Sequence, residues 1–309
     1  MSTSEAEQEP GMFAGLADIH AFRQGAREFG ATAPRALAHL PTGTYDTIPV
    51  PAEAGVPELM LYRPAGVPGP WPVYVNLHGG GFVLGDWEPD DPYCRFIADT
   101  AGCAVVNLDY VTAPEHPFPA AIDQTYTLLT WLHRHGSDLG LDGDRLAVGG
   151  HSAGGNISAA VSLRGAGRAD FPLRGQIIDY APLDLMISPR AKPDPDPAPD
   201  PVWREFVLRS AERFNTWYLS DPEQARDPLA SPILAPDLSG LPPALVITAG
   251  LDVLGAEGDA YATRLEQAGV PTEHVSYDGC THAFTHIGPE DAALDAWQRM
   301  AAFLRRVLA

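Results

Sequence analysis

Short apolar runs alternate with amphipathic stretches from residue 44 to the end of the chain. The runs are bounded by glycine, proline or polar turns, which is typical of strands. Strands are predicted at 44–50, 58–63, 73–77, 104–108, 145–148, 175–180, 244–249 and 273–277. Helices are predicted at 91–101, 120–135, 152–165, 202–219, 256–268 and 291–308. This alternation predicts an α/β fold in which a mostly parallel sheet of eight strands is covered by helices on both faces.

Two segments depart from the alternation. Apolar residues at helical spacing in 12–40 predict two short helices before the first strand. A proline-aspartate run at 189–201 cannot form helix or interior strand, because proline lacks a backbone donor. We therefore predict a disordered tail at 1–10, an N-terminal helical segment at 11–43, one α/β domain at 44–183 and 226–309, and an insertion at 184–225.

The charge balance of the chain excludes several kinds of partner. The 309 residues carry a formal net charge of −20, which argues against nucleic acid, anionic membrane surfaces and anionic substrates. Neither a secretion signal nor an apolar run long enough to span a membrane is apparent. The three cysteines are odd in number and lack the close spacing of a metal site, so we expect free thiols and a cytoplasmic location.

The segment 150–154 reads Gly-His-Ser-Ala-Gly and joins a predicted strand to a predicted helix. A turn this tight strains the backbone at Ser152 and leaves no room for a Cβ at Gly150 or Gly154. The hydroxyl would then stand at the end of a strand, beside the N–H groups of a helix N-terminus. We interpret Ser152 as a nucleophile, although such a turn can also serve packing alone.

A serine nucleophile requires a base, and position must choose it among ten histidines. His282 follows the last predicted strand, where a strand end would bring it beside Ser152. His286 is the nearest rival. His151 precedes the serine but should project to the opposite side of the turn. We therefore expect His151 to be a packed or hydrogen-bonded side chain.

The acid that orients the base is predicted from the same end of the sheet. Asp252 directly follows the strand at 244–249, whereas Glu257 and Asp259 fall on the next helix, where acidic residues usually meet the helix dipole. The resulting order Ser152, Asp252, His282 is the order of an α/β-hydrolase triad.

The segment 78–81 reads His-Gly-Gly-Gly and follows a predicted strand. Glycines at a strand end can turn their N–H groups toward a ligand, and with Ala153 they would form an oxyanion hole. A flexible loop or a phosphate-binding turn is the alternative. The chain lacks the lysine of a phosphate-binding loop and a Gly-x-Gly-x-x-Gly segment opening a helix, which argues against phosphate.

Together these segments resemble the hormone-sensitive-lipase-like carboxylesterases, the bacterial family IV esterases. The resemblance extends from about residue 57 to 300 and rests on 78–81, 113–120, 150–154, Asp252 and His282. It implies the α/β-hydrolase fold, with a cap made of N-terminal helices and a mid-chain insertion.

The resemblance also assigns roles to residues. Ser152, Asp252 and His282 would form the triad, and the N–H groups of Gly80, Gly81 and Ala153 would form the oxyanion hole. No metal and no organic cofactor are implied. We expect the substrate to contact Phe82, Trp87, Trp203, Phe206 and Leu254.

Several positions depart from the family pattern. The family usually has Asp where this chain has His151, often has His where Asp90 stands, and usually has Gly where Ala283 follows the triad histidine. None of these changes removes a triad member. They leave the pocket lining, the pH optimum and the reaction type open.

The sequence therefore predicts a serine carboxylesterase acting on a neutral short-chain or aryl ester through an acyl-enzyme. A lyase, dehydratase or cyclase on the same scaffold is the first alternative, and a non-catalytic small-molecule receptor is the second. We also predict a homodimer formed through the edge strand 273–277, because the last strand should lie outermost in the sheet.

Overall fold

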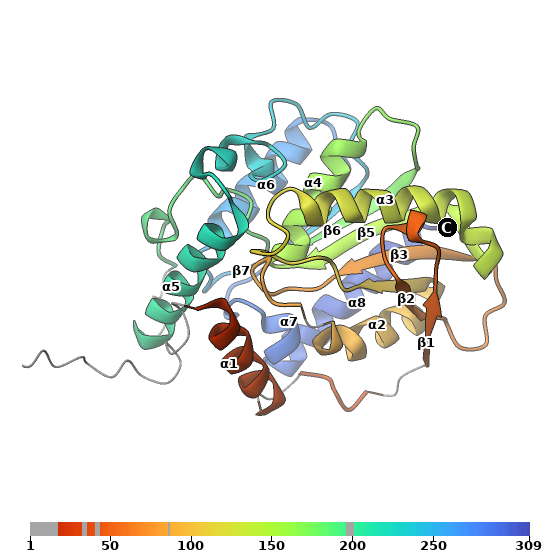
Figure 1. The fold of residues 1–309 in the computed structure, drawn as a ribbon, viewed down its shortest axis with the longest axis horizontal. Coiled ribbons are helices and arrows are strands. Elements are labelled where there is room, and N and C mark those ends of the chain that lie inside the picture. The colour runs from red at the N-terminus through yellow and green to blue at the C-terminus, as the bar shows by residue number, and fades with distance from the viewer. Residues whose placement is uncertain (1–17, 33–35, 41–43, 86, 196–200) are drawn as a thin grey trace, which may run out of the picture.

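An eight-stranded sheet runs through the computed structural model, which describes residues 18–32, 36–40, 44–85, 87–195 and 201–309 (Figure 1). The strands are β1 (Tyr45–Pro49), β2 (Glu58–Tyr62), β3 (Trp71–Leu77), β4 (Ala104–Leu108), β5 (Leu141–His151), β6 (Leu173–Asp179), β7 (Ala244–Ala249) and β8 (Thr272–Tyr277). Their order is β1-β2-β4-β3-β5-β6-β7-β8. β1 and β2 are antiparallel to their neighbours. The other strands, β3 to β8, are parallel to one another. The predicted mostly parallel sheet is confirmed.

Helices cover both faces of this sheet (Figure 1). They are α1 (Ile19–Thr32), α2 (Asp91–Ile97), α3 (Ala120–His135), α4 (Ala153–Gly165), α5 (Pro201–Tyr218), α6 (Gly255–Gln267), α7 (Phe284–Ile287) and α8 (Glu290–Val307). Side chains alternate across the central strands, as the strand period of two requires. Val73 and Val75 pack with α3 and α4, whereas Tyr74 packs with α2 and α8. The core therefore consists of one apolar layer on each face of the sheet.

The N-terminal segment contains one helix among the described residues, where the sequence predicts two. After α1, residues 36–39 form a turn in which Leu37 has a φ of 59°. A bulky residue in this left-handed region cannot continue an α-helix. The predicted tail at 1–10 and the first apolar residues of the segment 12–40, Phe13 and Leu16, lie outside the described residues.

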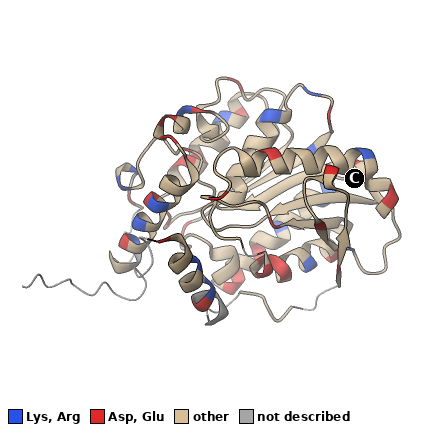
Figure 2. Cartoon of the chain, in the orientation of Figure 1, with Lys and Arg blue, Asp and Glu red and all other residues tan. Residues whose placement is uncertain are grey.

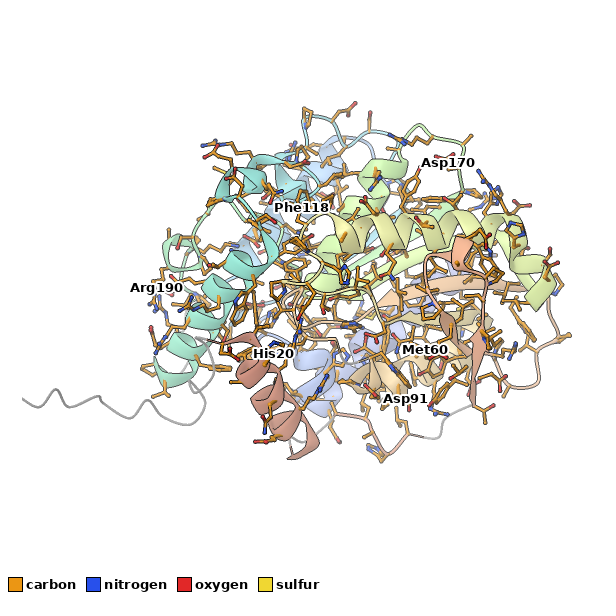
Figure 3. All side chains as sticks on the ribbon, viewed as in Figure 1. His20, Met60, Asp91, Phe118, Asp170 and Arg190 are labelled. Carbon is orange, nitrogen blue, oxygen red and sulfur yellow. The ribbon has the colours of Figure 1, made fainter. Side chains whose placement is uncertain are left out.

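The insertion after β6 contributes α5, which lies beside α1 (Figure 1). Phe22 of α1 contacts Phe214 of α5 at a ring-centroid distance of 5.5 Å and Trp217 at 5.8 Å. Phe118, which precedes α3, packs edge-on against Tyr218 at the end of α5 (Figure 3). Aromatic contacts thus join the insertion both to α1 and to the main body of the molecule.

Polar contacts hold the insertion together, join it to α6 and fix the chain on either side of it. Arg190 forms ion pairs with two glutamates of α5 at the outer surface (Figure 3). Lys192 pairs with Glu257 of α6 at 2.6 Å, and both side chains are buried. The amide nitrogen of Asn156 on α4 donates to the carbonyl oxygens of Pro182 and Ala230, at 2.7 and 2.9 Å. These two carbonyls bracket the predicted insertion 184–225, whose boundaries stay a prediction.

Charged residues lie mostly on the helices and the outer loops, and red and blue positions are interspersed (Figure 2). The middle strands of the sheet carry few charges in the same view. Among the described residues, no helix combines the length and the apolar composition needed to cross a membrane.

Candidate active site

Ser152 occupies a strained turn between β5 and α4. Its φ is 51° and its ψ is −116°, a conformation that only the surrounding structure can enforce. A Cβ at Gly150 or Gly154 would overlap with the carbonyl oxygen of Leu77 on β3. The backbone N–H of Ser152 donates to the carbonyl of Asp179 at 2.9 Å. Glycine is therefore required on both sides because the turn is pressed against the neighbouring strand.

The structure brings the three predicted triad residues together from three segments. Nε2 of His282 lies 2.9 Å from Oγ of Ser152, and Nδ1 of His282 lies 2.6 Å from Oδ2 of Asp252. Asp252 lies in the turn after β7, and His282 lies between β8 and α7. The Asp252 carboxylate is buried and also accepts from the N–H of Leu254 at 3.1 Å. This line of contacts can draw a proton from the serine and hold the resulting imidazolium.

The environment of His282 strengthens its affinity for a proton. Burial alone would lower the pKa of this imidazole, but the charge of Asp252 and the hydrogen bond that Nδ1 of His282 donates to Asp252 outweigh burial. Asp179 adds a smaller effect of the same sign. The pKa of His282 is therefore raised above its usual value.

Three N–H groups near Ser152 are available to a ligand. Gly80 and Gly81 follow β3 with φ values of 123° and 59°, and Ala153 is the first residue of α4. In the described part of the chain, the N–H groups of these three residues form no hydrogen bond. Unpaired donors at a helix start and a glycine turn are suited to a developing oxyanion.

The ring of His78 supports the glycine turn. It stacks on Tyr110 at a centroid distance of 4.2 Å, and its Nδ1 donates to the carbonyl of Gly79 at 2.7 Å. The hydroxyl of Tyr110 donates to the carbonyl of His78 at 3.1 Å. These contacts fix the loop without using the N–H groups of Gly80 and Gly81.

Phe214 of α5 lies directly over Gly81, because a Cβ at Gly81 would overlap its ring. The helical periodicity of 202–219 predicts that Phe214 lies on the packed, apolar face of the helix, but it does not identify what the ring packs against. The insertion therefore reaches the glycine turn through a residue absent from the predicted substrate contacts.

The five predicted substrate contacts occupy different surroundings. Phe82 is buried and stacks on Tyr218 at 3.8 Å, and Phe206 is partly buried against the same apolar layer. Leu254 follows Asp252 at the start of α6. The ring of Trp87 packs on Tyr45 of the edge strand β1 rather than beside Ser152. The side chain of Trp203 lies outside the described part of the structure.

The other two candidate histidines lie on the far side of the serine turn. His151 is buried, and its Nδ1 lies 2.7 Å from Oδ2 of Asp179, in line with its predicted role as a hydrogen-bonded side chain. Nε2 of His286 lies 3.0 Å from Asp90 rather than near Ser152. Sequence patterns did not point to the buried partners Asp179 and Thr285, although Asp179 lies near the end of the predicted strand 175–180.

Comparison with known proteins gives consistent matches. The family model described as alpha/beta hydrolase fold matches residues 74–286. Carboxylic ester hydrolase LipN of Mycobacterium tuberculosis is 37% identical over 247 residues, which is 77% of this chain and 63% of LipN. An arylesterase of Saccharolobus solfataricus is 33% identical over 68% of this chain and 67% of its own. The solved structure titled Bacterial Heroin Esterase has a TM-score of 0.81 and 32% identity, covering 96% of this chain and 94% of that chain.

Proposed function

The chain belongs to the α/β-hydrolase family, in its hormone-sensitive-lipase-like group, and is a carboxylic ester hydrolase. We propose that it cleaves neutral short-chain or aryl esters through an acyl-enzyme on Ser152. One observation carries the proposal. His282 lies within hydrogen-bond distance of both Ser152 and Asp252, at 2.9 and 2.6 Å.

In the first half of the reaction, Oγ of Ser152 attacks the ester carbonyl carbon while its proton passes to Nε2 of His282. Asp252 holds the proton on Nδ1 and stabilises the imidazolium. The carbon–oxygen bond to the alcohol then breaks, and His282 returns its proton to the departing alkoxide. The acyl group remains bonded to Ser152.

In the second half, water replaces the alcohol. His282 takes a proton from the water, whose oxygen attacks the acyl carbon, and Ser152 leaves with that proton. In both halves the carbonyl oxygen becomes an oxyanion. The N–H groups of Gly80, Gly81 and Ala153 stabilise it, because they are already oriented and need no reorganisation.

A neutral ester of modest size fits the surroundings of these groups. The net charge of −20 disfavours anionic substrates. Phe214 covers Gly81, and Phe22 and Trp217 continue the aromatic surface, which favours apolar acyl or aryl groups. The names of the relatives, an arylesterase and a heroin esterase, support the same substrate class.

Assembly and location are further parts of the proposal. Among the described strands, β8 is the last in the sheet order and pairs with β7 alone, so its outer edge can pair with a second copy in a homodimer. All three cysteines are free and buried, which supports a reducing compartment such as the cytoplasm.

A fluorophosphonate probe tests the acyl-enzyme. It should label one serine per chain, Ser152, and abolish hydrolysis of an aryl acetate. Ser152→Ala should resist the probe and lower kcat by a factor on the order of 10⁴ or more. Near-normal ester hydrolysis by this variant would remove the basis of the proposal.

A further inference from the structure

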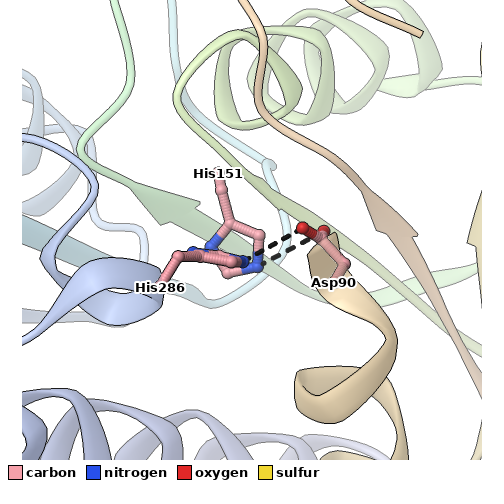
Figure 4. A group of neighbouring side chains, drawn as sticks. All are labelled: Asp90, His151 and His286. Atoms are coloured by element: carbon pink, nitrogen blue, oxygen red, sulfur yellow. Dashed lines mark hydrogen bonds and ion pairs between the residues drawn. The ribbon is translucent and has the colours of Figure 1, made fainter. Parts of the chain in front are cut away.

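Behind the serine turn, three side chains from separate segments converge in a cluster in which Asp90 and His151 are buried and His286 is partly exposed (Figure 4). Asp90 precedes α2, His151 ends β5, and His286 lies on α7. Nε2 of His286 is 3.0 Å from Oδ1 of Asp90, and Nε2 of His151 is 3.9 Å from Oδ2. Each residue offers one ligand atom, and the three atoms lie within 4.8 Å of one another.

The outward nitrogen of each ring is held by a partner. Nδ1 of His151 lies 2.7 Å from the carboxylate of Asp179, to which it must donate. Nδ1 of His286 lies 3.0 Å from the hydroxyl of Tyr180 and 3.1 Å from that of Thr285.

The hydroxyl protons can form one continuous series of donors. Thr285 donates its proton to Asp179 at 3.0 Å, and Tyr180 lies 2.8 Å from Thr285. With Tyr180 donating to Thr285, the oxygen of Tyr180 accepts the Nδ1 proton of His286. Both Nε2 atoms can then carry lone pairs for an ion, the tautomer found in metal-binding histidines, in place of the hydrogen bond between Nε2 of His286 and Asp90 at 3.0 Å.

Hydrogen bonding leaves one of these atoms without a partner. Nε2 of His151 is fully buried and forms no hydrogen bond with any described residue. The whole residue is 1% exposed. Buried polar atoms are usually satisfied, and this nitrogen faces a carboxylate that is too distant for a hydrogen bond, so a partner bound between them would satisfy both groups.

We propose that Asp90, His151 and His286 bind a divalent transition-metal ion of the zinc type. Two imidazoles and a carboxylate suit such an ion, and tetrahedral ligands lie roughly 3.3 Å apart. The two oxygens of Asp90 face different histidines, and Asn76 orients the carboxylate by donating to Oδ2 at 2.7 Å. Asp179 supports His151 in the same way that a carboxylate supports many metal-bound histidines.

The charges in the cluster also suit a dication. Asp90 and Asp179 are buried, and in the described part of the chain their only ion-pair partners are histidines. One divalent ion would balance both carboxylates with neutral imidazoles. The ion would join the segments that carry Ser152 and His282 without touching either side chain.

Metal content and thermal stability test the site directly on protein without an affinity tag. After treatment with a chelator and dialysis, addition of Zn²⁺ should load one ion per chain and raise Tm by about 5 °C. Co²⁺ should produce visible absorption without the charge-transfer band of a thiolate ligand, which excludes the cysteines. No stoichiometric binding and an unchanged Tm in the unmodified chain would overturn the proposal.

Variants identify the ligands. Asp90→Asn and His286→Gln should lose the Zn²⁺-dependent rise in Tm and the Co²⁺ spectrum. The matched control is His274→Ala, which removes a histidine from another pair, His274 with Asp259 at 3.0 Å, near the surface. It should retain both responses. His286→Gln removes a proposed ligand and leaves the triad intact. Normal metal binding by this variant would show that the ion binds elsewhere and would refute the assignment.

Discussion

At the scale of single residues, Ser152 illustrates how local strain is maintained. Its positive φ costs on the order of 1–3 kcal/mol in a non-glycine residue. The N–H of Ser152 donates to Asp179, and its carbonyl accepts from Asn156 at 3.1 Å. These bonds and the contact of the turn with Leu77 offset the strain, so the hydroxyl is held in position before a substrate arrives.

The pH dependence of activity should report the state of His282. Only the neutral imidazole can accept the serine proton, and Asp252 raises its pKa. We expect kcat/KM to rise with pH through one ionisation above the ordinary histidine value of about 6.5. His282 loses its proton, and the enzyme gains activity, as the pH increases through the raised pKa of His282.

Replacing the neighbouring charge provides the control for this prediction. In Asp252→Asn, burial still disfavours the imidazolium but the opposing carboxylate is gone, so the midpoint should move to lower pH and kcat should fall by a factor on the order of 10⁴. Residual activity can be followed with an activated aryl ester. A wild-type midpoint below the ordinary value, or no movement in the variant, contradicts this assignment of the base.

Residues within short motifs were predictable from the sequence because each motif has its own steric logic. Gly150 and Gly154 flank a turn that excludes a Cβ, and this requirement is local. The partners of His151 were not predictable. Asp179 lies 28 residues away, and Thr285 bonds to Asp179 across 106 residues. Only the folded sheet brings such positions together.

At the scale of elements, α5 controls the space beside the glycine turn. Phe214 packs on Gly81, so Phe214→Ala should open room there and raise kcat/KM for bulky acyl esters relative to acetyl esters by about 10-fold. A series of aryl esters of increasing acyl length measures this ratio.

The control for this change lies on the same helix. Thr216 is exposed on α5, and Thr216→Ala should leave the acyl-length ranking unchanged. If Phe214→Ala alters stability but keeps the parent ranking, α5 supports the fold without shaping the substrate pocket.

The buried pair of Lys192 and Glu257 should anchor the insertion to α6. Lys192→Met leaves a buried carboxylate without its counterion, and the free energy of unfolding should fall by about 3–5 kcal/mol. Urea denaturation measures the loss. Arg226→Met breaks the exposed pair with Glu223 and should cost at most about 1 kcal/mol. Equal effects of the two substitutions would show that the buried pair is not an anchor.

Periodicity predicted most helices and strands, but it could not predict the short helix α7 or the turn at Leu37. The short helix α7 has only four residues, too few to show a period. The turn at Leu37 interrupts a segment whose apolar spacing alone predicts helix. Packing against the rest of the molecule decides both cases, and a pattern along the chain does not contain that information.

At the scale of the whole molecule, strand alternation predicted a mostly parallel sheet, and the structure adds the strand order that leaves β1 and β8 at the edges. If β8 pairs with a second copy, sedimentation at micromolar concentration should give the mass of a dimer. A lysine on the outer strand should oppose pairing, so Ser276→Lys should shift the equilibrium toward monomer.

The opposite edge provides the matched control for assembly. Thr47 is an exposed residue of β1, and Thr47→Lys should leave the dimer intact. A monomeric wild-type protein, or equal effects at the two edges, contradicts an interface through β8.

The hydrogen bonds of the Asn156 amide mark a segment of this protein that can be replaced as a unit. One buried nitrogen binds carbonyls that lie 26 and 74 residues further along the chain, so the two ends of the stretch from Pro182 to Ala230 meet at α4. A segment whose two ends already meet can be exchanged for one of different length with a small change in loop-closure entropy. The stretch between Pro182 and Ala230 is therefore a natural boundary for chimaeras, in which substrate preference could be transplanted while the hydrolytic machinery is kept.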